Sequence, residues 1–120
     1  MRIALAQIQS KPGNVHANLT AHLNWVHKAV QQNCDAVFFP ELSLTGYEPS
    51  LSSVLRIDPT DDILQPFQAV SDEAKITIGI GVPTKSNGET KISMLIFQPH
   101  TSCVTYSKQI LHTDEKPYFV

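Results

Sequence analysis

Three charged residues, Glu41, Lys108 and Glu115, stand where their side chains could do chemistry. Glu41 follows directly on an apolar run that ends in Pro40, and in open α/β sheets ligands bind at the carboxyl ends of the strands. A carboxylate that is partly desolvated in such a place has a raised pKa, which suits a general base. From position alone, a solvated loop glutamate is the commoner role for such a residue.

Lys108 follows a second candidate strand, in the string Tyr106-Ser107-Lys108. An ammonium group at a strand end can stabilise an oxyanion that develops during a reaction. A strand-terminal lysine more often keeps a sheet edge from pairing with other chains. Glu115 comes seven residues after Lys108, and this spacing alone carries little information.

Two further residues could border the same site. Tyr47 follows Gly46 in the loop after Glu41, and it could pack over the site entrance or simply stabilise the loop. His112 lies between Lys108 and Glu115. It could line a substrate pocket or lie on the surface.

The two cysteines do not fit the role of a nucleophile. Cys103 lies five residues before Lys108, and an odd offset along a strand puts two side chains on opposite faces. Cys34 precedes the strand that leads to Glu41, so it lies at the wrong end of that strand. Both are interpreted as small, partly buried residues.

The histidines give no metal site. His16, His22 and His27 are spaced six and five apart, whereas two ligands on one helix face need a spacing of three or four. We interpret all three as part of a solvated helix face, and we expect no bound metal.

The composition is that of one modest domain. The 120 residues are 42% hydrophobic, and nine basic against eleven acidic side chains give a formal charge of −2. No basic cluster indicates a nucleic-acid site, and no apolar run reaches the roughly 20 residues that span a bilayer. The first residues lack the apolar region of a signal peptide. We therefore expect a cytoplasmic protein that binds neither nucleic acid nor a membrane.

The hydrophobic pattern predicts the elements that must position the charged residues. Two helices are predicted from apolar spacings of three and four, the first one capped by Asn14. Short apolar runs between turn signals predict five strands. The helices are expected over 15–30 and about 62–75, the strands at 2–8, 37–39, 76–82, 91–98 and 102–106, and loops at 42–53 and 83–88.

The order of these elements predicts an α/β fold, with two helices on one face of a mixed β-sheet. Strands such as Val37–Phe39 are apolar on both faces, so the second face needs a cover that the predicted elements do not supply. We expect either a fragment of a longer protein or a chain that depends on a partner.

Two longer strings contain the charged residues. The string from Phe39 to Tyr47, FPELSLTGY, resembles the F-P-E-x-x-x-x-G-Y signature of the nitrilase (carbon–nitrogen hydrolase) superfamily. The string YSKQIL from Tyr106, followed by Glu115 and by Tyr118-Phe119, is similar to that family's Y-x-K-x-x-L…E…Y-F segment. The opening IALAQ also matches, so the resemblance covers the whole chain in the family's order. One departure is the string KISM from Lys91, where the family often has an Asn.

The resemblance implies half of an αββα nitrilase-like sandwich. Residues 1–120 would be the N-terminal part of a single carbon–nitrogen hydrolase domain that ends before the nucleophile motif. Glu41 would match the general base, Lys108 the catalytic lysine, and Glu115 a supporting glutamate that helps to position Lys108. The nucleophilic cysteine of the family lies in a third motif that this chain lacks. No cofactor enters this chemistry, and the complete protein is expected to form a homo-oligomer.

From this resemblance we expect the complete protein to hydrolyse a small amide or nitrile through a thioester, and the 120-residue chain alone to be inactive. Two alternatives stay open. The chain could be a non-catalytic remnant that binds a partner through its open sheet face. It could also be the glutaminase part of a larger amidotransferase.

Overall fold

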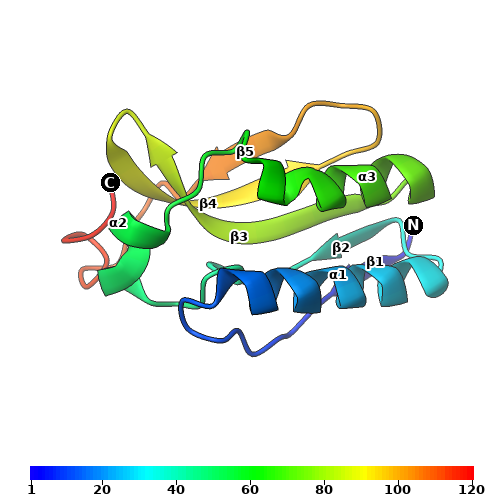
Figure 1. Cartoon of the computed structure of the whole chain (residues 1–120), viewed down its shortest axis with the longest axis horizontal. Helices are drawn as coiled ribbons and strands as arrows, with labels where there is room; N and C mark the ends of the chain where they lie inside the picture. Colours follow the sequence, from blue (N-terminus) through cyan, green and yellow to red (C-terminus); the bar gives the residue numbers. More distant parts are fainter.

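Five strands form one mixed sheet whose spatial order follows the chain, β1-β2-β3-β4-β5 (Figure 1). The computed structural model describes all residues, 1–120. Neighbours from β1 to β3 are parallel, and those from β3 to β5 are antiparallel. The predicted α/β class with a mixed sheet is confirmed. The strands are β1 Ile3–Leu5, β2 Ala36–Phe38, β3 Thr77–Ser86, β4 Glu89–Phe97 and β5 Val104–Ser107.

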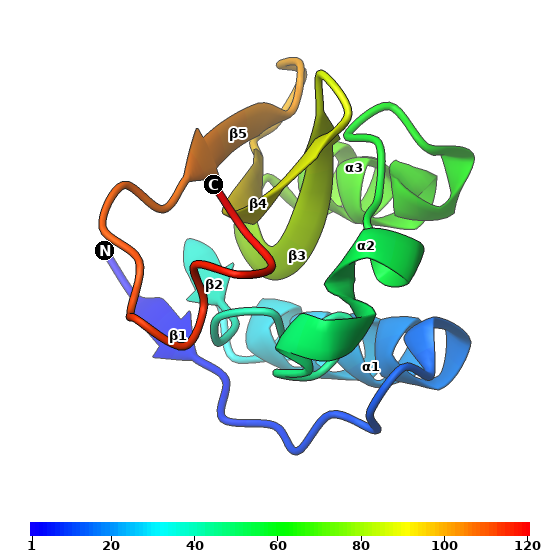
Figure 2. The ribbon, with the colours of Figure 1, turned by 90° about the vertical axis from the view of Figure 1, so that its left-hand side faces the viewer.

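Figure 2 shows the helices together on one side of the curved sheet. Asn14 caps α1, because its side chain accepts a hydrogen bond from the Ala17 backbone N–H. Pro66 lies in the first turn of α3, where its missing N–H costs no bond. Short helical turns over 49–55 were not predicted from the sequence. The helices are α1 Val15–Gln31, α2 Ser52–Leu55 and α3 Gln65–Ala74, with 3₁₀ turns at Pro49–Leu51 and Asp62–Leu64. None of them has the length and apolar composition that crossing a membrane requires.

The core lies between the helices and the sheet. Val26 of α1, Phe67 of α3, Ile80 of β3 and Leu95 of β4 have no exposed surface. Burying each of these side chains stabilises the fold by about 1.5–3 kcal/mol. This packing fixes α1 and α3 against the sheet.

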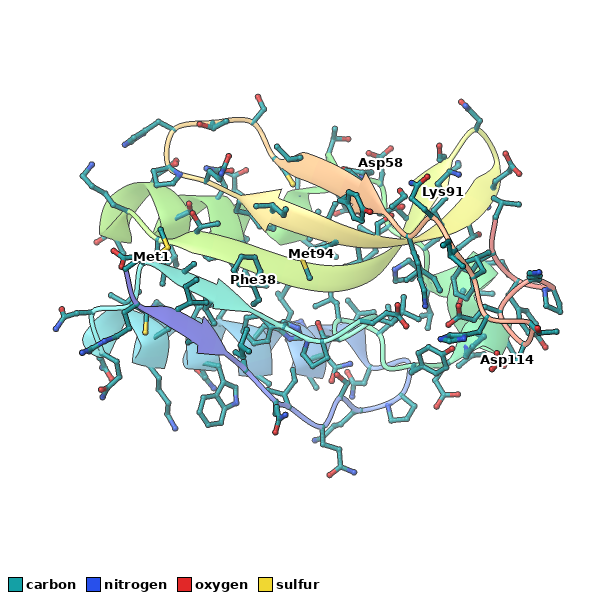
Figure 3. The ribbon with its side chains drawn as sticks, turned by 180° about the vertical axis from the view of Figure 1, so that it is seen from behind. Met1, Phe38, Asp58, Lys91, Met94 and Asp114 are labelled. Atoms are coloured by element: carbon teal, nitrogen blue, oxygen red, sulfur yellow. The ribbon has the colours of Figure 1, made fainter.

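The opposite face of the sheet is apolar and uncovered. Phe38 of β2 and Met94 of β4 lie on the face turned to the viewer in Figure 3, and both flank Gly79 of β3. On β1, Ile3 is 52% and Leu5 77% exposed. The apolar run of β1 is therefore not buried on both faces. The reason is that β1 is an edge strand with a packed layer on one side only.

The prediction of a loop at 83–88 is wrong, because β3 continues to Ser86 and the hairpin turn consists only of Asn87-Gly88. Pro83 is tolerated because its ring nitrogen points away from β4. Its carbonyl accepts a hydrogen bond from the Ile57 N–H at 2.8 Å, on the side opposite β4. Since the N–H and C=O of one strand residue point the same way, no bond of the β3–β4 ladder is lost.

Candidate active site

Glu41 lies just beyond β2, in a tight turn that crosses over β3. Phe39 still donates its N–H to the Gly79 carbonyl at 2.9 Å, and Leu44 donates to the Gly81 carbonyl at 2.9 Å. Between these two anchors the backbone passes so close to Gly81 that a Cβ there would lie 2.5 Å from the Leu42 nitrogen and 3.0 Å from the Glu41 carbonyl carbon. Gly81 therefore sets how near Glu41 lies to the sheet.

Gly81→Ala is expected to lower the free energy of unfolding by about 1–3 kcal/mol, as overpacking against backbone does, and to displace Glu41. Gly79→Ala is the matched control, because its Cβ would meet the Phe38 ring and the Met94 sulfur, which are side chains with room to move on the uncovered face. Urea denaturation of both variants measures the difference. An equal or larger loss in Gly79→Ala would contradict the role given to Gly81.

Lys108 directly follows β5 and is fixed by its own backbone. Its N–H donates to the Ile92 carbonyl at 2.7 Å, which extends the pairing with β4 by one bond. The side chain reaches back toward the turn, so that Nζ lies 2.9 Å from Glu41 Oε1 and 3.1 Å from Glu115 Oε1. The structure thus brings together the three charged residues that the sequence singled out.

A small cluster of apolar side chains supports this meeting point. Leu42, Ile92 and Phe119 are buried against one another, with Leu111 packed beside them. These residues neighbour Glu41, Lys108 and Glu115 in the chain or in the sheet. Through this cluster the turn after β2, strand β4 and the C-terminal segment pack against one another.

Glu115 is completely buried, and its carboxylate is fully occupied. Oε1 accepts from the His112 N–H at 2.9 Å and from Lys108 Nζ, and Oε2 accepts from the Tyr47 hydroxyl. Burial by itself raises the pKa of this carboxyl, but the hydrogen bonds from Tyr47, His112 and Lys108 outweigh it and lower the pKa to about 2. Glu115 is therefore ionised near neutral pH.

The stability of the fold should depend on the ionisation of Glu115. Because its pKa is lowered from 4.5 to about 2 on folding, its contribution is complete above about pH 4.5 and is lost as the pH falls toward 2. Asp58 and Asp72 also have lowered pKa values, so they act in the same window. We expect wild type to lose more unfolding free energy than Glu115→Gln between about pH 5 and about pH 2.5. Urea denaturation across this range checks it, and parallel curves for the two proteins would contradict it.

The contacts of Glu115 and Glu41 also shift the pKa values of Lys108 and Tyr47. The hydrogen bond to Glu41 is the largest cause that raises the pKa of Lys108, and the bond to Glu115 adds to it, whereas burial opposes both. The hydrogen bond to Glu115 raises the pKa of Tyr47 to about 12. Lys108 is therefore held as an ammonium ion and Tyr47 as a neutral donor.

A cavity of about 400 Å³ lies beside Glu41 and Lys108. Part of its wall is a row of cross-strand neighbours, Gly81, Met94 and Tyr106, so the cavity opens on the uncovered face of the sheet. Glu41 keeps 40% and Lys108 24% of the side chain exposed, so both can be reached from this cavity.

Tyr47, expected either over the site entrance or as a stabiliser of its loop, and His112, expected either in the pocket or on the surface, both lie around Glu115. The Tyr47 hydroxyl donates to Glu115, and neither residue belongs to the wall of the cavity. The His112 side chain is exposed, and only its backbone N–H reaches the site. Both residues donate a hydrogen bond to Glu115, which in turn holds Lys108.

The cysteines lie elsewhere. Cys34 lines a hollow between β1 and α1, and Cys103 lines another that also includes Asp72 of α3. Burial raises the pKa of the Cys103 thiol, which makes it a poorer nucleophile. No group of three or more His, Cys, Asp or Glu side chains is clustered so that it could hold a metal ion.

Sequence reasoning missed His22, and the prediction that it lies on a solvated helix face is wrong. His22 has no exposed surface, whereas His16 and His27 are exposed as predicted. The position of His22, four residues before the buried Val26, was the available signal. It was missed because a polar side chain fits the buried face of a helix only when it has hydrogen-bond partners, and one of the partners of His22, Ser43, comes from a distant segment.

The chain is similar to known proteins over nearly its whole length. The model of the carbon–nitrogen hydrolase family matches residues 2–119. The glutamine-dependent NAD(+) synthetase of Acinetobacter baylyi is 30% identical over 98% of this chain, which spans 23% of that protein. The solved NitN amidase of a Nesterenkonia species superposes with a TM-score of 0.83 at 24% identity, over 100% of this chain and 49% of the amidase.

Two further solved structures, variants of the amidase from Nesterenkonia sp. AN1, are complexes with acrylamide and with butyramide, at TM-scores of 0.83 and 0.82 and identities of 23% and 24%. This chain covers 47% and 48% of them, and all of it is matched in both. At these identities the likeness shows the fold, whereas the family model extends over nearly every residue. The chain belongs to the carbon–nitrogen hydrolase family.

Proposed function

We propose that this chain supplies the general base and the oxyanion-stabilising cation of an enzyme that hydrolyses small amides through a thiol nucleophile. The observation that carries this proposal is the position of Lys108 Nζ, 2.9 Å from Glu41 and 3.1 Å from Glu115. Glu115 is buried and bound on both oxygens, so it serves as a fixed anchor for Lys108. Glu41 is partly exposed to the cavity, so it is the carboxylate that is free to exchange a proton with a bound reactant.

The reaction follows from these positions. Glu41 accepts the proton of a cysteine thiol, and the thiolate attacks the amide carbon while the Lys108 ammonium stabilises the oxyanion. When the tetrahedral intermediate collapses, the C–N bond breaks and Glu41 passes the proton to the departing amine, which leaves a thioester. Glu41 then removes a proton from water, which attacks the thioester and releases the acid and the thiol. Neither Cys34 nor Cys103 lines the cavity, so we propose that the thiol comes from sequence outside these 120 residues.

The relatives support small amides as the substrate class. The solved amidase complexes contain acrylamide and butyramide, and one amidase variant carries an adduct at its active-site cysteine. A cavity of about 400 Å³ with Met94 and Tyr106 in its wall suits a short apolar acyl group. The cytoplasmic location and the homo-oligomer expected of the complete protein remain part of this proposal.

The test is ammonia release by the complete protein from a panel that contains acrylamide, butyramide and glutamine. Turnover of the short amides, together with loss of turnover in Glu41→Ala, would support the proposal. We expect the purified 120-residue chain to release no more ammonia than its own Glu41→Ala variant. Turnover by that chain above the variant would show that the thiol is not needed from elsewhere.

The second candidate is a glutaminase that passes ammonia to a synthetase. The observation that favours it is the 30% identity to the glutamine-dependent NAD(+) synthetase of Acinetobacter baylyi. The same panel separates the two candidates. Turnover of glutamine without turnover of butyramide would favour the glutaminase.

A further inference from the structure

A buried histidine outside the proposed reaction contacts the chain on both sides of Glu41. His22 of α1 has no exposed surface. Its ring lies 4.3 Å, centroid to centroid, from the ring of Phe39, two residues before Glu41. Its Nε2 lies 2.8 Å from the hydroxyl of Ser43, two residues after Glu41.

The hydrogen bonds of His22 fix its tautomer. Nδ1 lies 2.6 Å from the Asn18 carbonyl, which can only accept, so Nδ1 carries the proton. In the neutral ring Nε2 must then accept the Ser43 hydroxyl proton. Burial lowers the pKa of His22, and the bond to Asn18 opposes it in part, which agrees with a neutral ring.

Ser43 extends this contact to the sheet. Its Oγ accepts from the Gly81 N–H at 3.2 Å while its hydroxyl proton goes to His22. Gly81 is the residue over which the Glu41 turn crosses. A continuous chain of bonds therefore runs from α1 through Ser43 to the strand beneath Glu41.

The turn needs such support because its backbone is strained. Leu42, between Glu41 and Ser43, has φ 54°, in the left-handed region that a side chain with a Cβ rarely adopts. Leu42 is 1% exposed, and its carbonyl accepts the Gly46 N–H at 2.8 Å. Without outside contacts the turn would relax toward a less strained backbone and would carry Glu41 with it.

We propose that His22 is a positioning residue that, through Ser43 and Phe39, holds the Glu41 carboxylate against Lys108. The competing explanation is that His22 only fills the core between α1 and the sheet. The two differ in what happens at Lys108, which His22 does not touch. For turnover this inference rests on the proposed function, but the contact between Glu41 and Lys108 can be tested without any activity.

The experiment measures the reactivity of the Lys108 amine in the complete protein by trace labelling with acetic anhydride near neutral pH, with the exposed Lys116 as internal reference. Only the uncharged amine reacts, so loss of the Glu41 contact raises labelling. His22→Phe keeps the ring stacking and removes both hydrogen bonds, and Ser43→Ala removes one hydroxyl. We expect each to raise Lys108 labelling about fivefold, and Glu41→Ala, which removes the contact with Lys108 entirely, sets the upper limit.

The double variant and a core control separate positioning from packing. If His22 and Ser43 act as one unit, His22→Phe with Ser43→Ala should label Lys108 no faster than the stronger single variant. Leu64→Ala truncates the core near α3, away from Ser43, and should leave Lys108 labelling at the wild-type value. If His22→Phe does not fold, the comparison of Ser43→Ala with Leu64→Ala is sufficient to test the inference.

Wild-type labelling in Ser43→Ala, or an equal rise in Leu64→Ala, would overturn the inference. In kinetics, positioning predicts that kcat for a small amide falls about 10-fold to 100-fold with KM nearly unchanged. If Lys108 labelling responds as expected but wild type turns over no amide, the positioning stands and the proposed function fails.

Discussion

Replacing Glu41 with Gln in the complete protein is expected to lower the turnover of a small amide by about 10²–10⁴-fold, the usual contribution of a general base. The substitution keeps the size of the side chain, and its amide oxygen can still accept from Lys108 Nζ, which lies 2.9 Å from Glu41 Oε1 in the wild type. What it removes is the ability to take up the thiol proton and to pass it to the leaving amine. The loss should therefore appear in kcat, and steady-state ammonia release measures it.

Glu48→Gln is the matched control, because it makes the same change of charge and size farther along the same loop, where Glu48 has no ion pair with Lys108. We expect it to retain turnover within a factor of about two of wild type. Turnover by Glu41→Gln within tenfold of Glu48→Gln would remove Glu41 from the role of base.

Removing the Glu115 carboxylate should have the largest effect on stability. In Glu115→Ala the Lys108 ammonium loses its buried partner, and the Tyr47 hydroxyl and the His112 N–H lose their acceptors. Breaking a buried pair on one side costs about 3–5 kcal/mol, and we expect a loss near the lower value because Lys108 keeps 24% of its side chain exposed. Urea denaturation at neutral pH measures it.

Asp114→Ala is the control for this loss, since it removes a neighbouring carboxylate that is exposed and outside the ion pairs. We expect it to change the free energy of unfolding by less than about 0.5 kcal/mol. Similar losses of unfolding free energy in the two variants would mean that the stability depends on the negative charge of the C-terminal segment as a whole and not on the contact between Glu115 and Lys108.

Much of the fold follows from local sequence signals. The cap at Asn14, the spacing of apolar residues over 15–30 and the apolar run at 37–39 each predict an element that the structure contains. The mixed sheet also follows, because two helical crossovers give parallel neighbours and two short connections give antiparallel ones. The motifs around Glu41 and Lys108 pointed to one site, and the structure brings these residues within 2.9 Å.

The features that sequence reasoning missed depend on contacts between distant segments. His22 can be buried because its Nε2 has the Ser43 hydroxyl as a hydrogen-bond partner. The sequence of the helix itself gives no indication of this partner. The continuation of β3 through Pro83 depends on Ile57, which takes over the bonds on the side away from β4. The placement of Tyr47 around Glu115 depends on a hydrogen bond between residues 68 apart. Hydrophobic periodicity carries no information on such pairs.

The two carboxylates that hold Lys108 differ greatly in their distance along the chain, and this difference bears on the order of assembly. Glu115 is only seven residues from Lys108, whereas Glu41 is about 67 residues away, so closing the longer loop costs about 2 kcal/mol more in chain entropy. We expect the lysine and its buried anchor to meet early, in a local turn beside the β3–β4 hairpin. The proton-transferring carboxylate would then dock last, onto a cation that is already fixed.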